Sequence, residues 1–271
     1  MESMDGDTRV DKFYDRLAPH YHLIFGSWEA SQERQAEKLY GILTSHVEME
    51  MEMETERRKM RVLDAAAGIG TQTLGLGKEY GEHVEIDAGD LSEASIARLA
   101  DEVVARDLGS VVTHTRVSDL RDLGSVWEQG TYDVVLAMDN AIPHLLTRED
   151  VKAAFESVAD VLGPNGVFVF SVRDYQSCSR ESPRPVVHDD GGSKRIYVQV
   201  WDWESDDVYK VSLYVISETV GRVPSVVTAG TTRYRAWTMS QLSDIAAETG
   251  FSTEWLLDDA WYQPVCVVRS T

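Results

Sequence analysis

The sequence predicts an α/β protein in which helices cover both faces of a mostly parallel sheet, with a helical segment before the sheet and a small antiparallel β insertion late in the chain. Three observations predict this architecture. Strand-like and helix-like segments alternate from Arg61 to Val172, glycine turns separate several of them, and consecutive strand-like runs replace the alternation after Val172. Strands that alternate with helices are joined by crossover connections, and such connections produce a parallel sheet.

The chain begins with a segment expected to be helical from Asp11 to Tyr40, with aromatic residues concentrated in its first half. An acidic run, EMEMEMETERRK, follows from Glu48. It lacks apolar periodicity and repeats like charges, which is typical of a solvated surface segment. We therefore expect residues 48–60 to form an acidic surface insertion without a role in chemistry.

The core is expected to contain five strands and three helices. The strands are Arg61 to Ala65, His83 to Ala88, Val111 to Arg116, Tyr132 to Ala137 and Gly166 to Val172, and the helices lie near Thr71 to Glu79, Glu93 to Ala105 and Glu149 to Leu162. Three side chains, Ser92, Thr147 and Thr238, precede helical segments and carry an oxygen that can accept a hydrogen bond from a free backbone amide. We expect each to cap a helix.

The pattern changes after Val172. Strand-like runs at Lys194 to Trp201, Val208 to Ser217 and Thr231 to Trp237 follow one another with polar turns between them, which indicates an antiparallel sheet. A helix from Ser240 to Thr249 and strands at Ser252 to Leu257 and Pro264 to Arg269 then complete the main sheet.

Composition excludes several classes of function. The 271 residues include 26 basic and 46 acidic side chains, a net charge of −20, so the basic surface that binds nucleic acids or anionic membranes is missing. No apolar run approaches the roughly 20 residues that span a bilayer, and we expect a soluble cytoplasmic protein. Because Cys178 and Cys266 are far apart and lack metal-ligand spacing, no metal site is expected.

The most informative segment is VLDAAAGIGTQT, which begins at Val62 and runs from a strand through a glycine turn into a helix. Gly68 and Gly70 allow the backbone to pass close to a ligand at the carboxyl end of the strand, where open α/β sheets bind ligands. About 20 residues later, Asp90 ends the second strand and can accept hydrogen bonds from a ribose diol. This pattern predicts a nucleoside-containing cofactor.

The same segment argues against a dinucleotide, because the fingerprint G-x-G-x-x-G requires glycine where Thr73 stands. It resembles instead the first motifs of class I S-adenosylmethionine (SAM)-dependent methyltransferases, and SDL at Ser118 resembles the element that binds adenine in them. The resemblance implies a Rossmann-like fold, SAM as cofactor and S-adenosylhomocysteine as its product. The implied cofactor-binding residues are Tyr21, Trp28, Arg34, Asp64, Ala65, Gly68, Gly70, Asp90, Leu91, Asp119, Leu120 and Met138.

Within this superfamily, most of the chain resembles the glycine, sarcosine and dimethylglycine N-methyltransferases. The segments that carry the resemblance are FYDRLAPHYHLIF from Phe13, SQERQA from Ser31, GIGTQ from Gly68, MDNAIPHLL from Met138 and SVRDY from Ser171. In such enzymes an arginine at the position of Arg34 holds the methionine carboxylate of the cofactor. Tyr21 and Trp28 would then close over the sulfonium, since aromatic faces favour a cation.

The resemblance also implies an acceptor site. Arg173 corresponds to the arginine that binds the acceptor carboxylate, a role that suits its two parallel donors. Asn140 would orient the acceptor, and His144 would fix its loop or accept a proton. Further candidates for lining the acceptor pocket are Tyr175, Tyr209 and Arg233.

These inferences give a domain organisation. An N-terminal segment closes over the cofactor (residues 1–47), the acidic insertion follows (48–60), and then come the cofactor-binding core (61–175), an antiparallel roof over the acceptor (176–237) and the last helix and strands (238–271). The expected function is SAM-dependent methylation of the amine of glycine, sarcosine or dimethylglycine, as in betaine synthesis.

Three alternatives stay open. The nearest is a methyltransferase of the same fold that acts on another small-molecule amine or hydroxyl acceptor, such as a natural-product intermediate. A non-catalytic SAM-binding protein and a nicotinamide dehydrogenase are the others. The sequence does not determine the oligomeric state.

Overall fold

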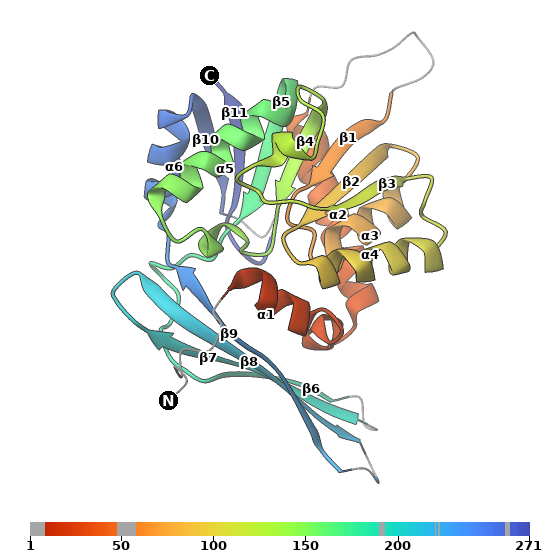
Figure 1. Cartoon of the computed structure of the whole chain (residues 1–271), viewed down its shortest axis with the longest axis vertical. Helices are drawn as coiled ribbons and strands as arrows, with labels where there is room; N and C mark the ends of the chain where they lie inside the picture. The colour runs from red at the N-terminus through yellow and green to blue at the C-terminus, as the bar shows by residue number, and fades with distance from the viewer. Residues whose placement is uncertain (1–8, 48–57, 190–192, 220, 222, 258–260) are drawn as a thin grey trace.

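The computed structural model describes residues 9–47, 58–189, 193–219, 221, 223–257 and 261–271. A seven-stranded sheet forms its centre, with the strand order β10-β11-β5-β4-β1-β2-β3 (Figure 1). The strands are β1 (Met60–Asp64), β2 (Val84–Asp90), β3 (Val112–Val117), β4 (Tyr132–Ala137), β5 (Leu162–Ser171), β10 (Phe251–Leu256) and β11 (Val265–Ser270). β11 runs antiparallel to its neighbours β5 and β10, and the other neighbouring strands pair in parallel.

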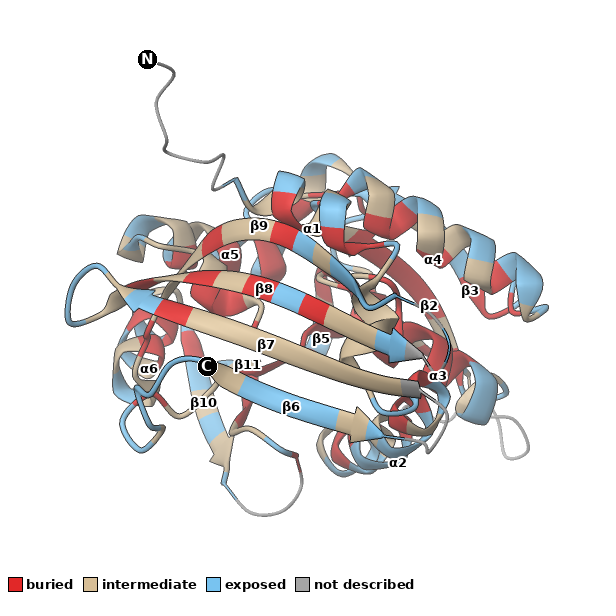
Figure 2. Ribbon diagram, turned by 90° about the horizontal axis from the view of Figure 1, so that it is seen from below, coloured by how far each residue is buried: buried red, intermediate tan, exposed pale blue. Residues whose placement is uncertain are grey.

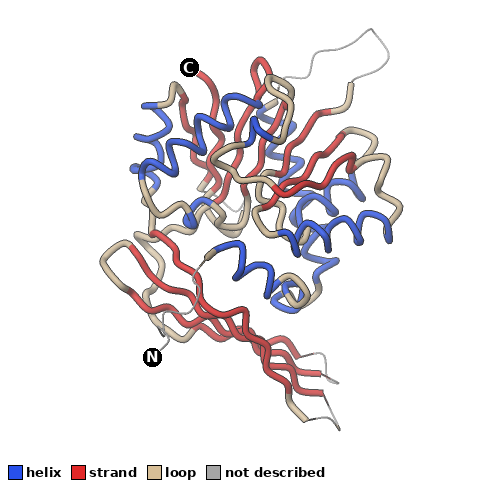
Figure 3. The backbone as a smooth tube through the Cα atoms, in the orientation of Figure 1, coloured by secondary structure: helices blue, strands red, loops and turns tan. Residues whose placement is uncertain are grey.

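Helices cover both faces of this sheet (Figure 3). The α-helices are α1 (Val10–Leu17), α2 (Trp28–His46), α3 (Thr71–Tyr80), α4 (Glu93–Ala105), α5 (Arg148–Val161) and α6 (Met239–Glu248), and the short 3-10 helices are η1 (Tyr21–Ile24), η2 (Leu123–Ser125) and η3 (Ile142–His144). Helices α2, α3 and α4 pack in one apolar cluster, and α5 and α6 pack in another on the opposite face. None of the helices in the described residues has the length and apolar character needed to cross a membrane.

Alternation along the strands builds these two clusters. In β1, Val62 belongs to the cluster under α2 to α4, while Leu63 belongs to the cluster under α5 and α6. Val134 and Val135 divide in the same way in β4. Because successive side chains of a strand point to opposite faces, a continuous apolar run fits a strand that is buried on both sides.

The order of the parallel strands reverses between β1 and β4. The chain proceeds from β1 to β2 and β3 in one direction, then returns to β4 and β5 on the other side of β1. The connections diverge at this point and leave a crevice outside the carboxyl ends of the strands, which is where open α/β sheets bind their ligands.

A second sheet contains the strands β6 (Arg184–Asp189), β7 (Ser193–Trp203), β8 (Val208–Thr219) and β9 (Ser225–Arg235), all antiparallel. Helix α1 lies between this sheet and the central unit (Figure 1). Phe13 and Leu17 of α1 pack on Leu213, Val215 and Ala229 of β8 and β9. The outer strand β6 is largely exposed (Figure 2). The second sheet and α1 therefore roof one end of the central sheet.

The predicted α/β fold with an antiparallel insertion is confirmed. Each predicted core strand and helix is present, and the side chains of Ser92, Thr147 and Thr238 accept hydrogen bonds from backbone amides at the starts of their helices. The strand β6 was not predicted, because an exposed segment lacks the buried alternation that marks a strand.

The segment from Asp11 to Tyr40 is largely helical, as predicted, but it is interrupted twice. It forms α1, η1 and α2. Pro19 has no amide hydrogen and its ring clashes with the preceding turn, so α1 stops before it. The side chain of Ser27 then caps α2 by accepting a hydrogen bond from the amide of Ala30.

The predicted acidic insertion lies mostly outside the described residues, since residues 48–57 are not described. Its last residues belong to the core instead. Arg58 forms an ion pair with Asp133 at 2.6 Å, and Met60 is the first residue of β1.

Candidate functional site

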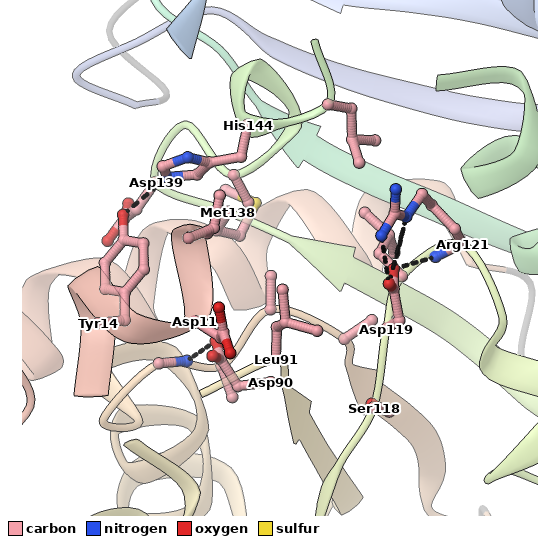
Figure 4. A pocket seen from close by; sticks show the side chains of 18 of the residues that line it. Asp11, Tyr14, Asp90, Leu91, Ser118, Asp119, Arg121, Met138, Asp139 and His144 are labelled. Atoms are coloured by element: carbon pink, nitrogen blue, oxygen red, sulfur yellow. Dashed lines mark hydrogen bonds and ion pairs between the residues drawn. The ribbon is translucent and has the colours of Figure 1, made fainter. Parts of the chain in front are cut away.

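A cavity of about 470 Å³ opens at the carboxyl ends of β1 to β4. Its walls come from the loops after these strands and from α1. The lining residues include Tyr14, Tyr21, Ala65, Gly68, Gln72, Asp90, Leu91, Ser118, Asp119, Leu120, Arg121, Met138, Asp139 and His144. Several of them are shown in Figure 4. The cavity therefore lies in the crevice that the strand order creates.

The turn after β1 forms the floor of this cavity. Gly68 and Gly70 both have positive φ, 54° and 94°, which glycine adopts without strain. A Cβ atom at Gly70 would lie 2.3 Å from Cδ1 of Leu99, so the helix packs directly on the turn. Asp90 holds the turn in place, because its carboxylate accepts hydrogen bonds from the amides of Gly68 and Ser92, each at 2.8 Å.

Asp64 lies under the turn and not in the cavity. Its carboxylate is buried and accepts a hydrogen bond from Oγ1 of Thr73 at 2.7 Å. Burial raises its pKa to about 7. Neither Asp64 nor Gly70 lines the cavity, so Asp64 supports the turn from behind and Gly70 shapes its backbone.

Asp119 lines the cavity, but its carboxylate is occupied by a neighbour. Arg121 donates to it from Nη2 at 2.6 Å and donates from Nη1 to Asp150, also at 2.6 Å (Figure 4). Burial of Asp119 opposes ionisation, but the hydrogen bonds from the guanidinium outweigh this effect and lower its pKa. A ligand that used Asp119 would have to share it with Arg121.

The chain turns sharply at the end of β4. Asp139 and Asn140 are consecutive non-glycine residues with positive φ, 55° and 70°. Such conformations are strained and persist where surrounding contacts hold them. Here the amide of Asp139 donates to Oγ of Ser171 at 2.8 Å, and Oδ1 of Asn140 accepts from the amide of Arg173 at 2.9 Å. This turn places Asp139 in the walls of the cavities.

A second cavity, of about 140 Å³, lies beside the first and under the antiparallel sheet. The two cavities share Tyr14, Tyr21 and Asp139 in their walls. The remaining wall of the second cavity includes Phe13, Phe25, Asn140, Arg173, Tyr197, Gln199, Tyr209, Tyr234 and Tyr262. Two ligands held in the two cavities would therefore meet at these three shared side chains.

A hydrogen-bonded cluster stands at this boundary. The hydroxyl of Tyr14 lies 2.9 Å from Nε2 of His144 and 3.2 Å from the hydroxyl of Tyr234. Figure 4 shows Tyr14 and His144 facing each other across this bond. The His144 ring is enclosed, and desolvation lowers its pKa to about 4, so the imidazole is neutral at pH 7.

Most of the predicted site residues come together. Tyr21, Ala65, Gly68, Asp90, Leu91, Asp119, Leu120, Met138 and His144 line the first cavity, and Asn140, Arg173 and Tyr209 line the second. Tyr175 stands behind the second wall, where its hydroxyl contacts Nδ2 of Asn140 at 3.0 Å and the hydroxyl of Tyr209 at 2.9 Å.

Three predicted residues lie elsewhere. Arg34 is exposed on α2 and donates to Oγ of Ser31 at 3.1 Å. Trp28 is buried, and the guanidinium groups of Arg98 and Arg106 each lie 5.2 Å from the centre of its ring. Neither side chain lines a cavity, so the structure does not support the roles assigned to them.

Arg233 is the third. It forms an ion pair with Glu204 at 2.7 Å and lies outside both cavities. Its neighbour Tyr234 lines the second cavity instead, since adjacent residues of a strand point to opposite faces.

Several lining residues were not predicted: Tyr14, Gln72, Asp139, Tyr197, Tyr234 and Tyr262. Asp139 lies inside the quoted segment MDNAIPHLL, and its position directly after a buried strand could have identified it. The tyrosines of β7 and β9 carry no local signal, because strand pairing alone brings them together. No group of three or more potential metal ligands is present among the described residues.

Comparisons with known proteins agree with this fold. Residues 62–166 match the family model described as a methyltransferase domain. No curated protein matches the chain. Among solved structures, DesVI from Streptomyces venezuelae is similar with a TM-score of 0.74 at 18% identity, over 94% of this chain and 98% of DesVI.

Two other solved structures are similar over nearly their whole lengths. The CcbJ methyltransferase from Streptomyces caelestis has a TM-score of 0.70 at 18% identity, covering 96% of this chain and 98% of its own. SAM-bound CalS10, an amino pentose methyltransferase from Micromonospora echinaspora, has a TM-score of 0.68 at 14% identity, covering 89% and 92%.

The strand order and the helices on both faces define a Rossmann-like α/β fold. Residues 62–166, which extend from β1 past β4 and include the turn at Gly68, thus match a methyltransferase domain, and the chain as a whole has the fold of the class I methyltransferases.

Proposed function

We propose that this methyltransferase transfers the methyl group of SAM to the amine of a small, polar natural-product-type molecule, with an amino sugar as the leading candidate. The observation that carries the proposal is the shared wall of the two cavities, at Tyr14, Tyr21 and Asp139. A cofactor in the larger cavity would present its methyl group through this boundary to an acceptor in the smaller one.

The larger cavity suits SAM. The carboxylate of Asp90 is fixed by two backbone amides and has the second-strand position from which a ribose diol is bound. Leu91 and Leu120 offer apolar surfaces to adenine, and the turn at Gly68 lets the cofactor approach the backbone. With Arg34 turned to solvent, Gln72, which donates from Nε2 to Asp139 at 2.9 Å, is the polar side chain that would face the methionine end.

The smaller cavity suits a polar acceptor with several hydroxyl groups. Its wall contains Asn140, Gln199 and four tyrosines from α1 and the second sheet, which can both donate and accept hydrogen bonds. The similarity to an amino pentose methyltransferase supports an amino sugar.

The residues act mainly by orienting the reactants. Bound SAM supplies an electrophilic methyl group, which an uncharged amine attacks in line. Holding both reactants in neighbouring cavities makes their encounter intramolecular, an effect worth up to about 7–11 kcal/mol. The hydroxyl of Tyr14, hydrogen-bonded to neutral His144, can accept a hydrogen bond from the amine and direct its lone pair toward the methyl group.

A second candidate acceptor is glycine or one of its methylated forms, and Arg173 favours it. The guanidinium lies 4.6 Å from the ring centre of Trp201, on the cavity wall, and no carboxylate of the described residues forms an ion pair with it. An acceptor carboxylate would provide that partner.

The test is incubation of the protein with methyl-labelled SAM and a panel of amino sugars, glycine, sarcosine, dimethylglycine and hydroxyl analogues, with mass detection of the products. Transfer to the amino sugars supports the first candidate, and transfer to the glycine series alone supports the second. Binding of SAM without transfer to any acceptor would contradict an amine methyltransferase acting on these classes.

A further inference from the structure

The acceptor cavity has an unusual wall. Eight of its seventeen lining residues are Phe or Tyr, whereas aromatic residues make up 9% of the whole chain. They come from α1, η1 and its C-terminal flank, three strands of the second sheet and the segment before β11. Hydrogen bonding to the hydroxyl groups of a sugar accounts for the tyrosine hydroxyls in this wall. It does not account for the large area of aromatic ring.

The rings enclose the boundary from different directions. The ring planes of Tyr14 and Tyr21 meet at 73° with centres 6.1 Å apart, and those of Tyr21 and Phe25 meet at 60° with centres 6.2 Å apart. On the sheet side, Tyr209 and Tyr234 are stacked at 5.6 Å. Rings at steep angles form adjoining walls and do not pack as a single flat layer.

The charges in the wall fit a cation. Asp139 is the one acidic residue among the described residues that line the cavity, and it lies at the boundary where the acceptor nitrogen would be. Arg173, the one basic lining residue, projects from the end of β5 and stacks on Trp201 of the second sheet. A cationic nitrogen beside Asp139 would therefore have aromatic faces around it and a carboxylate next to it.

From this arrangement, and resting on the proposed methyl transfer, we infer that the acceptor cavity is an aromatic cage for an alkylated ammonium ion, so that affinity increases with each methyl group on the nitrogen. Aromatic faces attract cations, and cages of this kind bind quaternary ammonium groups. The preferred acceptor is then already methylated, and the enzyme completes a tertiary or quaternary ammonium product.

The reaction is consistent with such a cage. As the methyl group moves, its bond to sulfur breaks, a bond to nitrogen forms, and the positive charge passes from the sulfonium to the nitrogen. The sulfur retains the bonding electron pair and becomes a neutral thioether. Because the cage faces the atom that gains the charge, it stabilises the transition state as well as the product.

The experiment compares the binding of two small molecules that have the same shape but differ in charge. Choline and its uncharged carbon analogue 3,3-dimethylbutan-1-ol are titrated by calorimetry into the protein saturated with S-adenosylhomocysteine. We expect choline to bind at least about tenfold more tightly, because attraction to a desolvated ring face depends on the charge. Equal or weaker binding of choline would overturn the inference.

Two variants of Tyr21 test whether an aromatic ring face contributes to the preference for choline. No hydrogen bond of the Tyr21 hydroxyl is present among the described residues, so Tyr21→Phe keeps the ring face and Tyr21→Leu removes it. We expect Tyr21→Phe to retain the preference for choline and Tyr21→Leu to lose most of it, with thermal unfolding confirming that both fold. An undiminished preference for choline in Tyr21→Leu would show that this ring face does not bind the cation and would overturn the cage at the boundary of the two cavities.

The results distinguish a failure of the cage from a failure of the proposed function. Methyl transfer to amines without any preference for choline would refute the cage and leave the methyltransferase assignment intact. A preference for choline without methyl transfer to any amine would refute the proposed acceptor class instead.

Discussion

The hydroxyl of Tyr14 and Nε2 of His144 lie 2.9 Å apart, although 130 positions separate the two residues in the chain. Tyr14 arrives on α1, and His144 arrives on η3 after the strained turn at the end of β4. Their contact closes the cluster at the boundary of the two cavities. It ties the N-terminal segment to the core at the place where methyl transfer is proposed.

Tyr14→Phe should slow methyl transfer without abolishing it. The substitution keeps the ring but removes the hydrogen bonds to His144 and Tyr234, and a neutral hydrogen bond contributes about 0.5–1.5 kcal/mol. We expect kcat/KM to fall roughly threefold to tenfold, with the affinity for SAM unchanged. Single-turnover rates and calorimetry measure the two quantities. An unchanged rate would show that the hydroxyl does not act on the acceptor.

The buried His144 should make stability depend on pH. Its pKa is lowered from 6.5 to about 4 in the folded protein, so below pH 6.5 the unfolded chain binds a proton that the folded chain does not. Its stabilising contribution is present above pH 6.5 and is lost as the pH falls toward 4. Relative to His144→Gln, the wild type should lose about 2–3 kcal/mol between pH 7 and pH 4.5.

Urea unfolding of both proteins at the two pH values measures this difference. The variant supplies the reference for all other titrating groups, because those groups are common to both proteins. Parallel losses in the two proteins would contradict the enclosed, neutral imidazole.

Asp90→Asn should weaken cofactor binding. The carboxylate accepts hydrogen bonds from the amides of Gly68 and Ser92. In the asparagine variant the side-chain NH₂ group would face one of these backbone N–H groups, so one hydrogen bond would be lost. Loss of a charged hydrogen-bond partner costs about 1.5–3 kcal/mol, so we expect the Kd for SAM to rise about tenfold to a hundredfold. Asp101→Asn, on the exposed side of α4, is the matched control. Equal affinities in the two variants would remove Asp90 from the site.

Gly70→Ala should destabilise the protein by about 2–5 kcal/mol, because the residue has positive φ and a new Cβ would meet Leu99 at 2.3 Å. Gly41→Ala is a control within α2, where no atom lies within 4 Å of the new Cβ. There we expect a gain of roughly 0.5–1 kcal/mol from helix propensity. Urea unfolding compares the two, and a tolerated Gly70→Ala would contradict the tight packing under the turn.

Arg173→Gln should act on acceptors according to their charge. If the guanidinium binds an acceptor carboxylate, kcat/KM for glycine-type amines should fall by about tenfold or more, while uncharged amino sugars change little. Arg233→Gln is the matched control, because Arg233 pairs with Glu204 outside the cavity. Equal losses for charged and uncharged acceptors would show that Arg173 only shapes the wall.

The core of the fold could be predicted from the sequence because its signals are local. Buried strands read as continuous apolar runs, and the caps at Ser92 and Thr147 mark helix starts within a few residues. The same reasoning predicted a helical segment from Asp11 to Tyr40 but not its division into α1, η1 and α2, which begins at Pro19. It also missed β6, which is too exposed to show a pattern.

The cofactor side of the site could be predicted from the sequence, but most of the acceptor side could not. The cofactor side lies on a few short segments at strand ends, so Gly68, Asp90 and Leu120 could be identified directly. The acceptor side depends on pairing between distant strands. Tyr209 lies opposite Tyr234 only through the register of β8 and β9, and adjacent positions such as Arg233 face away. A sequence pattern does not fix that register.

The most direct test of the account is a crystal structure with S-adenosylhomocysteine and an amine bound together. We predict that the ribose diol contacts Asp90, that adenine lies between Leu91 and Leu120, and that the sulfur faces the amine across the wall formed by Tyr14, Tyr21 and Asp139. A nucleoside bound elsewhere, or an amine outside the smaller cavity, would contradict it.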